Sequence, residues 1–186
     1  MPDKCNWYVL YTKTNAEERV VNGMGEAFRK MRLGYRFEPF CPNVEYYFRN
    51  KQAKIDGTNY RVKRLFPNYV FIETDMPEDK FIENFEKFIL DSSDIIRLLK
   101  YSEKNIALHP EEKARLEALL EHDRCLKHSV GKMIGGRVIV ESGPLKGQEN
   151  HITYVDRHNR AATIEFDLFY GKVIANAALE ITEKVA

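Results

Sequence analysis

Residues 1–122 alternate between two hydrophobic periods, which predicts both strands and helices in this part of the chain. Aromatic and β-branched runs predict four strands, one of them an irregular or edge strand because it contains two prolines: residues 7–11, 36–48, 65–72 and 95–101. Apolar residues at steps of three and four predict helices over residues 16–31, 78–90 and 110–122. This order predicts an α+β fold similar to a split βαβ unit, with an antiparallel sheet flanked by helices.

The pattern changes after residue 122. Residues 123–133 are polar and have no clear period, so they are predicted to form a linker. Five short β-type pieces follow, separated by glycines, a proline and polar residues: 137–141, 149–154, 163–166, 172–174 and 178–181. Short strands at this spacing predict a small all-β barrel. The sequence therefore predicts two domains, residues 1–122 and 134–186, joined by the linker.

The net charge is close to zero, with 29 Lys and Arg against 28 Asp and Glu. This balance excludes a strongly basic coat and an acidic tail. The charges are nevertheless unevenly placed. Residues 49–64 carry six basic side chains against Asp56 alone, whereas residues 73–94 carry eight acidic and two basic ones. These blocks are either two solvated faces or two faces with different partners.

The cysteines and the apolar runs indicate the compartment. Cys5, Cys41 and Cys125 are far apart and include no Cys-x-x-Cys pair, which favours a reducing cytoplasm and argues against a disulfide framework. No stretch approaches the ~20 apolar residues that cross a bilayer, and no signal peptide is visible. We therefore expect a cytoplasmic protein that has no membrane partner.

No catalytic signature is present. The chain lacks Ser-x-x-Lys, Gly-x-Ser-x-Gly and His-Glu-x-x-His. His122, Cys125 and His128 offer three ligands at three-residue steps, whereas a structural zinc site needs four. We expect no enzymatic activity, no cofactor and no metal. The alternative, an enzyme of unknown chemistry, would need a cluster of perturbed titratable groups in a pocket.

Three motifs carry a family resemblance. Trp-Tyr-Val-Leu at residues 7–10, Phe-Pro-Asn-Tyr-Val-Phe at residues 66–71 and the segment at residues 136–147 with its Gly-Pro-Leu-Lys-Gly turn are similar to motifs of the NusG family, in order and at family spacing. The resemblance implies a bacterial transcription elongation factor with an N-terminal NGN domain and a C-terminal, SH3-like KOW barrel. Its implied role is to bind RNA polymerase and to suppress pausing or termination.

Within the family, the chain resembles the specialised antitermination paralogues more than the housekeeping factor. Asn68 stands where the housekeeping form usually has Gly, and the helix near residues 80–82 lacks the His-Thr-Thr of RfaH. We favour a LoaP-type factor recruited by an RNA hairpin. An RfaH-like factor recruited by non-template DNA and an RNA-binding module without polymerase contact remain alternatives.

The resemblance also implies the polymerase contacts. Phe66, Pro67 and Tyr69 would contact the clamp helices of RNA polymerase, with Trp7 and Tyr8 as supports beneath them. In the KOW domain, Leu168, Phe169 and Tyr170 lie where the family exposes an apolar loop to Rho or to a small-subunit ribosomal protein. A buried barrel turn is the alternative for this loop.

A second set of candidates is basic. Basic side chains neutralise phosphates, and interleaved aromatic rings stack on unpaired bases. Aromatic residues interleave with the basic ones between residues 46 and 60. We therefore predict nucleic-acid contact, with RNA weakly favoured over DNA and an ordinary solvated hairpin as the alternative. The candidates are Lys13, Arg19, Arg29, Lys30, Arg32, Arg49, Lys51, Lys54, Arg61, Lys63 and Arg64.

Overall fold

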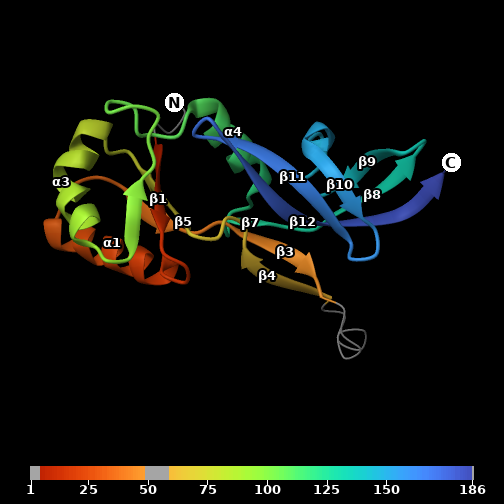
Figure 1. Ribbon diagram of the computed structural model, residues 1–186, viewed down its shortest axis with the longest axis horizontal. Coiled ribbons are helices and arrows are strands. Elements are labelled where there is room, and N and C mark those ends of the chain that lie inside the picture. Colours follow the sequence, from red (N-terminus) through yellow and green to blue (C-terminus); the bar gives the residue numbers. More distant parts are fainter. Residues whose placement is uncertain (1–4, 49–58, 186) are drawn as a thin grey trace. The chain divides into compact units, whose positions relative to one another are not determined.

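A computed structural model describes residues 5–48 and 59–185 of the chain. They form an α+β fold, as predicted, which divides into two compact units (Figure 1). The first unit comprises Met1–Cys41 and Phe66–Lys113, and the second comprises Pro42–Leu65 and Ala114–Ala186. Within the described residues, no helix combines the length and the hydropathy that a bilayer span requires.

The first unit is built on a four-stranded antiparallel sheet. In spatial order its strands are β2 (Phe37–Phe40), β5 (Tyr69–Thr74), β1 (Asn6–Thr12) and β6 (Ile95–Leu98). The single irregular or edge strand predicted over residues 36–48 is in fact two strands: β2, an edge strand that contains Pro39, and a separate strand at Asn43–Tyr47 in another sheet. The three predicted helices are confirmed as α1 (Glu17–Met31), α3 (Glu78–Asp91) and α4 (Pro110–Leu119), of which α4 runs across the boundary between the two units in the chain.

The central strand β1 is apolar on both faces, which explains its unbroken hydrophobic run. Successive side chains of a strand point to opposite faces. Tyr8 belongs to the main core, where its ring stacks on Phe81 of α3 with centroids 4.0 Å apart. On the other face, Trp7 packs edge-on against Phe40 and Phe71, with ring centroids 5.1 and 5.9 Å away. Both faces of the sheet are therefore covered around β1.

The strand predicted at residues 65–72 begins later than expected, at Tyr69. Residues 65–68 form bends and turns instead. Pro67 has no N–H to donate to a ladder, and Asn68 has a positive φ of 71°, which is incompatible with a β-strand. The Phe-Pro-Asn motif is therefore a turn that precedes the strand.

The second unit contains two sheets. A three-stranded sheet has the order β4 (Tyr60–Arg64), β3 (Asn43–Tyr47) and β7 (Cys125–Leu126). A five-stranded sheet has the order β10 (Ile152–Asp156), β11 (Ala161–Leu168), β12 (Gly171–Val185), β8 (Ser129–Ile134) and β9 (Arg137–Ser142). The short 3-10 helix η1 (Glu149–His151) precedes β10. The five-stranded sheet is the β-rich C-terminal region that the sequence predicts.

The boundary between the units differs from the predicted domain boundary. The β3–β4 hairpin groups with the second unit, and its strand β3 pairs with β7 through residues 43–44 and 125–126. The segment predicted as a linker, residues 123–133, contains β7 and most of β8. A two-residue strand is too short to show alternation, so its polar surroundings conceal it from a sequence pattern.

β12 joins two segments that the sequence predicts as separate strands. Its centre contains Asn176 and Ala177, which have low strand propensity. The strand continues because it changes partners along its length: residues 171–178 pair with β11, and residues 179–185 pair with β8. Backbone hydrogen bonding thus overrides the local propensity.

Candidate functional site

The predicted polymerase-contact residues divide into buried and exposed members. Trp7, Tyr8 and Phe66 are at most 1% exposed, so their rings lie out of reach of a partner. Pro67 is exposed and Tyr69 is half-buried. Phe66 is therefore buried beside Tyr69, with ring centroids 6.4 Å apart, and does not offer the direct contact that the resemblance implies. Trp7 lies on the same face of the sheet as Tyr69, whereas Tyr8 packs against α3 on the opposite face.

Tyr69 lies in a row of side chains across the sheet. Tyr11 is directly opposite Tyr69 in one strand pair and opposite Arg97 in the other. The two tyrosine rings lie 5.3 Å apart between centroids, and the guanidinium carbon of Arg97 is 5.8 Å from the Tyr11 centroid. We call Pro67, Tyr69, Tyr11 and Arg97 the tyrosine surface. The sequence analysis missed Tyr11, although alternation from Trp7 places it on the same face.

Hydrogen bonds hold the two buried aromatic residues of β1, Trp7 and Tyr8, in place. The indole N–H of Trp7 donates to Oε2 of Glu73 at 2.9 Å, and the hydroxyl of Tyr8 donates to the Met76 carbonyl oxygen at 2.8 Å. Burial raises the pKa of Tyr8 far above its ordinary value and also raises the pKa of Tyr69. Both hydroxyls therefore stay protonated at neutral pH, and that of Tyr8 remains able to donate to the Met76 carbonyl oxygen.

The turn before Tyr69 depends on Asn68. Its φ of 71° lies in the left-handed region, which Gly and Asn adopt most readily. Its backbone N–H donates to Oε1 of the buried Glu17 at 2.8 Å, and its carbonyl oxygen accepts from the backbone N–H of Thr12 at 2.8 Å. These bonds fix the turn to α1 and β1, which orients Pro67 and Tyr69.

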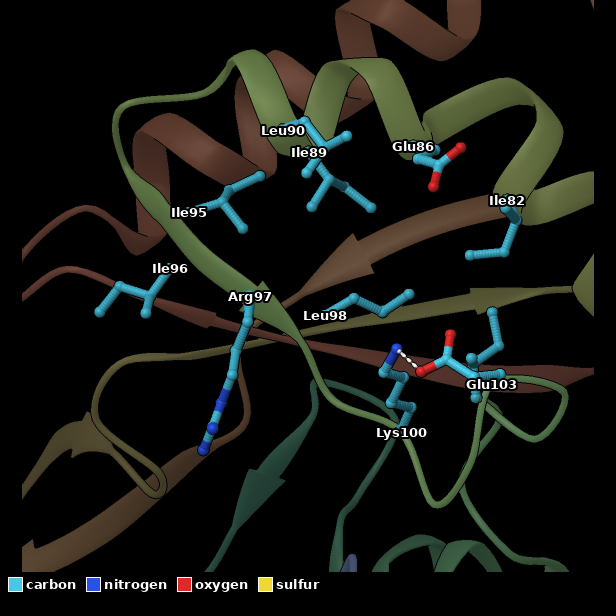
Figure 2. A pocket seen from close by; sticks show the side chains of 11 residues that line it. Ile82, Glu86, Ile89, Leu90, Ile95, Ile96, Arg97, Leu98, Lys100 and Glu103 are labelled. Atoms are coloured by element: carbon cyan, nitrogen blue, oxygen red, sulfur yellow. Dashed lines mark hydrogen bonds and ion pairs between the residues drawn. The ribbon is translucent and has the colours of Figure 1, made fainter.

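A second apolar feature of the first unit lies between α3 and β6 (Figure 2). This α3–β6 groove has a volume of about 370 Å³, and its apolar lining consists of Ile82, Ile89, Leu90, Ile95, Ile96, Leu98 and Ile106. Leu90 is 76% exposed and Ile96 is 53% exposed. The sequence analysis missed the groove because both residues lie in predicted elements, where periodicity alone does not identify exposed apolar positions.

The basic candidates of the first unit gather at one end of α1. Arg29, Lys30 and Arg32 are exposed there, and Arg32 ends the helix in a left-handed conformation. Arg19 has a different role, since its guanidinium donates to both carboxylate oxygens of Asp94 at 2.9 Å. The hydrogen bond from Arg19 holds the pKa of Asp94 below its ordinary value. Lys13 is exposed outside this group.

The basic candidates of the second unit lie on β4, paired with aromatic residues. The guanidinium carbon of Arg61 is 3.7 Å from the ring centroid of Phe48, and Nζ of Lys63 is 5.2 Å from that of Tyr46. The strand register places these four side chains on one face of the hairpin. Arg64 instead donates to Oδ1 of Asn43 at 3.0 Å. The interleaving predicted from the sequence is therefore present as cation–π pairs.

Three further basic candidates, Arg49, Lys51 and Lys54, lie outside the described residues. Among residues 5–48 and 59–185, no three His, Cys, Asp or Glu side chains gather in an arrangement that could hold a metal ion.

The predicted partner loop of the KOW region is a tight turn between β11 and β12. Leu168 pairs with Gly171 across the turn and is 7% exposed, whereas Tyr170 is 82% exposed. Phe169 and Tyr170 both have positive φ values, of 51° and 60°. Of the three predicted contact residues, Tyr170 therefore presents the largest accessible side chain, while Leu168 belongs to the core.

The comparisons with known proteins identify the family of the chain. The family model "NusG: Transcription termination factor nusG" matches residues 5–117, more than half of the chain. The transcription termination/antitermination protein NusG of Rickettsia bellii is 25% identical over 175 residues, which cover 90% of this chain and 83% of that relative. A solved structure described as "Domain interaction in Thermotoga maritima NusG" matches with a TM-score of 0.50 at 15% identity, covering 96% of this chain and 94% of the other, and supports the fold alone. The chain belongs to the NusG family of transcription termination and antitermination factors.

Proposed function

We propose that this protein is a transcription elongation and antitermination factor that acts by binding and not by catalysis. The first unit binds the clamp of RNA polymerase through the tyrosine surface. The basic surfaces bind nucleic acid and recruit the factor to particular transcripts. Family membership supports the general role, and the geometry of the described residues supports the assignment of each surface.

The observation that carries the polymerase assignment is the pair of half-buried rings on a rigid sheet. Tyr11 and Tyr69 are fixed by strand pairing, and the ring of Tyr69 packs against the buried Phe66, so they lose little conformational entropy when a partner binds. Tyrosine and arginine are the residue types that dominate binding energy at protein interfaces. An apolar helix face laid against such a surface is a common mode of recognition, and it fits a clamp helix.

Binding alone does not prevent termination. A ligand shifts a conformational equilibrium only by as much as its affinities for the two states differ. The tyrosine surface must therefore bind the elongating conformation of the polymerase more tightly than the paused one. The result is processive antitermination.

The nucleic-acid assignment rests on the cation–π pairs of the hairpin. Arg61 over Phe48 and Lys63 near Tyr46 combine phosphate neutralisation with rings on which bases stack. We favour an RNA hairpin as the recruiting element, as in LoaP-type factors, with non-template DNA as the alternative. The exposed Tyr170 is the proposed contact for Rho or a small-subunit ribosomal protein.

Binding to purified core RNA polymerase tests the polymerase assignment. Tyr69→Ala should weaken binding by at least about 30-fold, as expected for loss of a hot spot worth ~2 kcal/mol. The matched control is Leu90→Ser, which removes an exposed apolar side chain from the α3–β6 groove of the same unit. Unchanged affinity for Tyr69→Ala would contradict the assignment, and loss in Leu90→Ser alone would move the contact to the groove.

The second candidate function is an RNA-binding module without polymerase contact, which the cation–π pairs of the hairpin favour. In that case Tyr69→Ala would leave antitermination intact, whereas Arg61→Ala would abolish it. A reporter transcript that carries a terminator downstream of the recruiting element separates these two outcomes.

A further inference from the structure

A groove of about 340 Å³ lies entirely within the second unit and has a mixed aromatic and polar lining. Side chains of the β3–β4 hairpin line part of it, and side chains of β10, β11, β12 and the β10–β11 turn line the rest. We call it the hairpin–sheet groove. Its volume is at the lower end of the range for small-ligand sites, about 300–1,000 Å³.

The sheet side of the groove presents one exposed ring beside small residues. Tyr154 pairs with Thr163, and Thr163 pairs with Asn176, so the three side chains form a row on one face of the sheet. The next row contains Ala161 and Ala178, whose small side chains leave open space. Tyr154 is 64% exposed. A planar group can therefore lie against the face of this ring.

The row also supplies directional hydrogen-bonding groups. The hydroxyl of Thr163 donates to Oδ1 of Asn176 at 3.1 Å, which leaves the amide nitrogen of Asn176 as the donor end for a ligand. Asn176 is exposed. In the adjoining turn, the side chain of Asn159 is held by Asp156, since its amide nitrogen donates to Oδ2 at 2.7 Å. The polar groups of the groove are thus oriented before any ligand binds.

Two tyrosine rings of the hairpin each have a cation beside them, one cation from the hairpin and one from the β10–β11 turn. Nζ of Lys63 is 5.2 Å from the Tyr46 centroid, and the guanidinium carbon of Arg160 is 4.4 Å from the Tyr47 centroid. Arg160 is also fixed by an ion pair with Glu180 at 2.9 Å. The two cations therefore flank the groove, one from each of its two sides.

These groups match two parts of a nucleotide, the base and the phosphate. A tyrosine face stacks on a base, amides bond to its edge, and lysine and arginine contact its phosphates. A base inside a duplex is already stacked on both sides and cannot enter. An unpaired base is free to do so.

We propose that the hairpin–sheet groove binds one unpaired nucleotide of the nucleic-acid strand that recruits the factor. Its base stacks on Tyr154, its edge bonds to Asn176, and its phosphates contact Lys63 and Arg160. This inference rests on the proposed nucleic-acid binding and adds residues 154, 160 and 176 to it. It assigns to the C-terminal sheet a direct part in reading the strand.

Fluorescence titration of the full chain tests the proposal. The probe is a 12-nucleotide RNA with 2-aminopurine at its centre, used single-stranded, annealed to its complement, and as the DNA of the same sequence. Tyr154→Ala should weaken single-strand binding by about tenfold, as expected for the loss of one stacking contact, and should remove the quenching of 2-aminopurine. Tyr154→Phe should retain both, because it keeps the ring. Ile174→Ala is the matched control, because it removes an exposed apolar side chain of the same sheet outside the groove.

Salt dependence separates this proposal from simple charge attraction. Tyr154→Ala should leave the slope of log K against log salt unchanged, whereas Lys63→Ala should reduce its magnitude by about 0.7. If Tyr154→Ala binds and quenches like the wild type while Lys63→Ala weakens binding, the groove proposal is wrong and the charge-based contact stands. If the wild type binds none of the RNA or DNA probes, the groove proposal and the proposed nucleic-acid binding are both wrong. The proposed polymerase binding is unaffected, because it is tested separately with Tyr69→Ala. Tighter binding to RNA or to DNA supports the site and identifies the source of the strand.

Discussion

The tyrosine surface and the hairpin–sheet groove both place tyrosine rings beside an arginine, but their surroundings differ. In the first, Tyr69 and Tyr11 are half-buried on a sheet face that also carries the buried Trp7 and Phe71. In the second, Tyr154 is mostly exposed beside Thr163 and Asn176. Buried apolar side chains around the rings favour an apolar helix of a protein partner. Oriented amide groups favour the edge of a nucleobase. The side chains next to an aromatic ring therefore indicate its partner better than the ring itself does.

The largest expected effect separates buried supports from contact residues. Phe66→Ala should lower the free energy of unfolding by about 3–5 kcal/mol, because it removes a large side chain that is 1% exposed. Tyr69→Ala, its matched control from the same motif, should cost much less because the ring is half-buried. Urea denaturation of both variants measures the difference. Equal losses would mean that Tyr69 is also a core residue, and the comparison would fail.

The next largest loss of stability is expected at the turn that orients Tyr69. Asn68→Ala should destabilise the protein by about 1–2 kcal/mol, since alanine is strained at a φ of 71°. Asn68→Gly should be close to neutral because glycine adopts this conformation without a steric penalty. Thermal unfolding of the two variants checks this prediction. An equal loss in both variants would show that the asparagine side chain, and not the backbone conformation, holds the turn.

On the groove side of the comparison, the basic residues should act through charge. Lys63→Ala is expected to weaken single-strand binding several-fold near physiological salt and less at high salt. Arg29→Ala, at the end of α1 in the first unit, tests whether that group belongs to the same interface. A full wild-type affinity for Arg29→Ala with a reduced one for Lys63→Ala would assign strand binding to the second unit. The reverse result would assign it to α1.

The smallest expected effect is a pH dependence within the second unit. Burial raises the pKa of Glu45, but hydrogen bonds from the backbone and ring of His128, at 2.8 and 2.9 Å, outweigh it and hold the pKa below its ordinary value. The stability that this carboxylate contributes is complete above the pKa of an unfolded glutamate and is lost as pH falls through the lower folded-state value. Glu45→Gln should flatten the acid limb of a stability curve, measured by urea unfolding. An unchanged acid limb would show that Glu45 does not contribute to the pH dependence of stability.

The sequence predicts elements well where one period persists. The runs that became α1 and α3 have clear helical spacing, and the apolar β1 run has a strand-like composition. The sequence fails where pairing decides the structure: β7 is held by its neighbour β3, and β12 continues through Asn176 because it has partners on successive parts of its length.

The candidate sites were likewise predictable only in part from the sequence. Motifs locate the Phe66–Tyr69 region, and charge clustering locates Arg61 and Lys63 on the hairpin. Neither identifies Tyr11, Arg97 or Tyr154, because these residues join their sites through cross-strand register. Exposure is also set by tertiary packing, which is why Phe66 carries a family motif and is nevertheless buried.

The division of labour between the two surfaces can be tested in one paired binding measurement. Affinities for core RNA polymerase and for the single-stranded RNA probe are determined for Tyr69→Ala and Tyr154→Ala in the full chain. We expect Tyr69→Ala to lose polymerase affinity and keep RNA affinity, and Tyr154→Ala to show the opposite pattern. If both variants lose the same ligand, or neither loses any, then the two surfaces do not have separate partners.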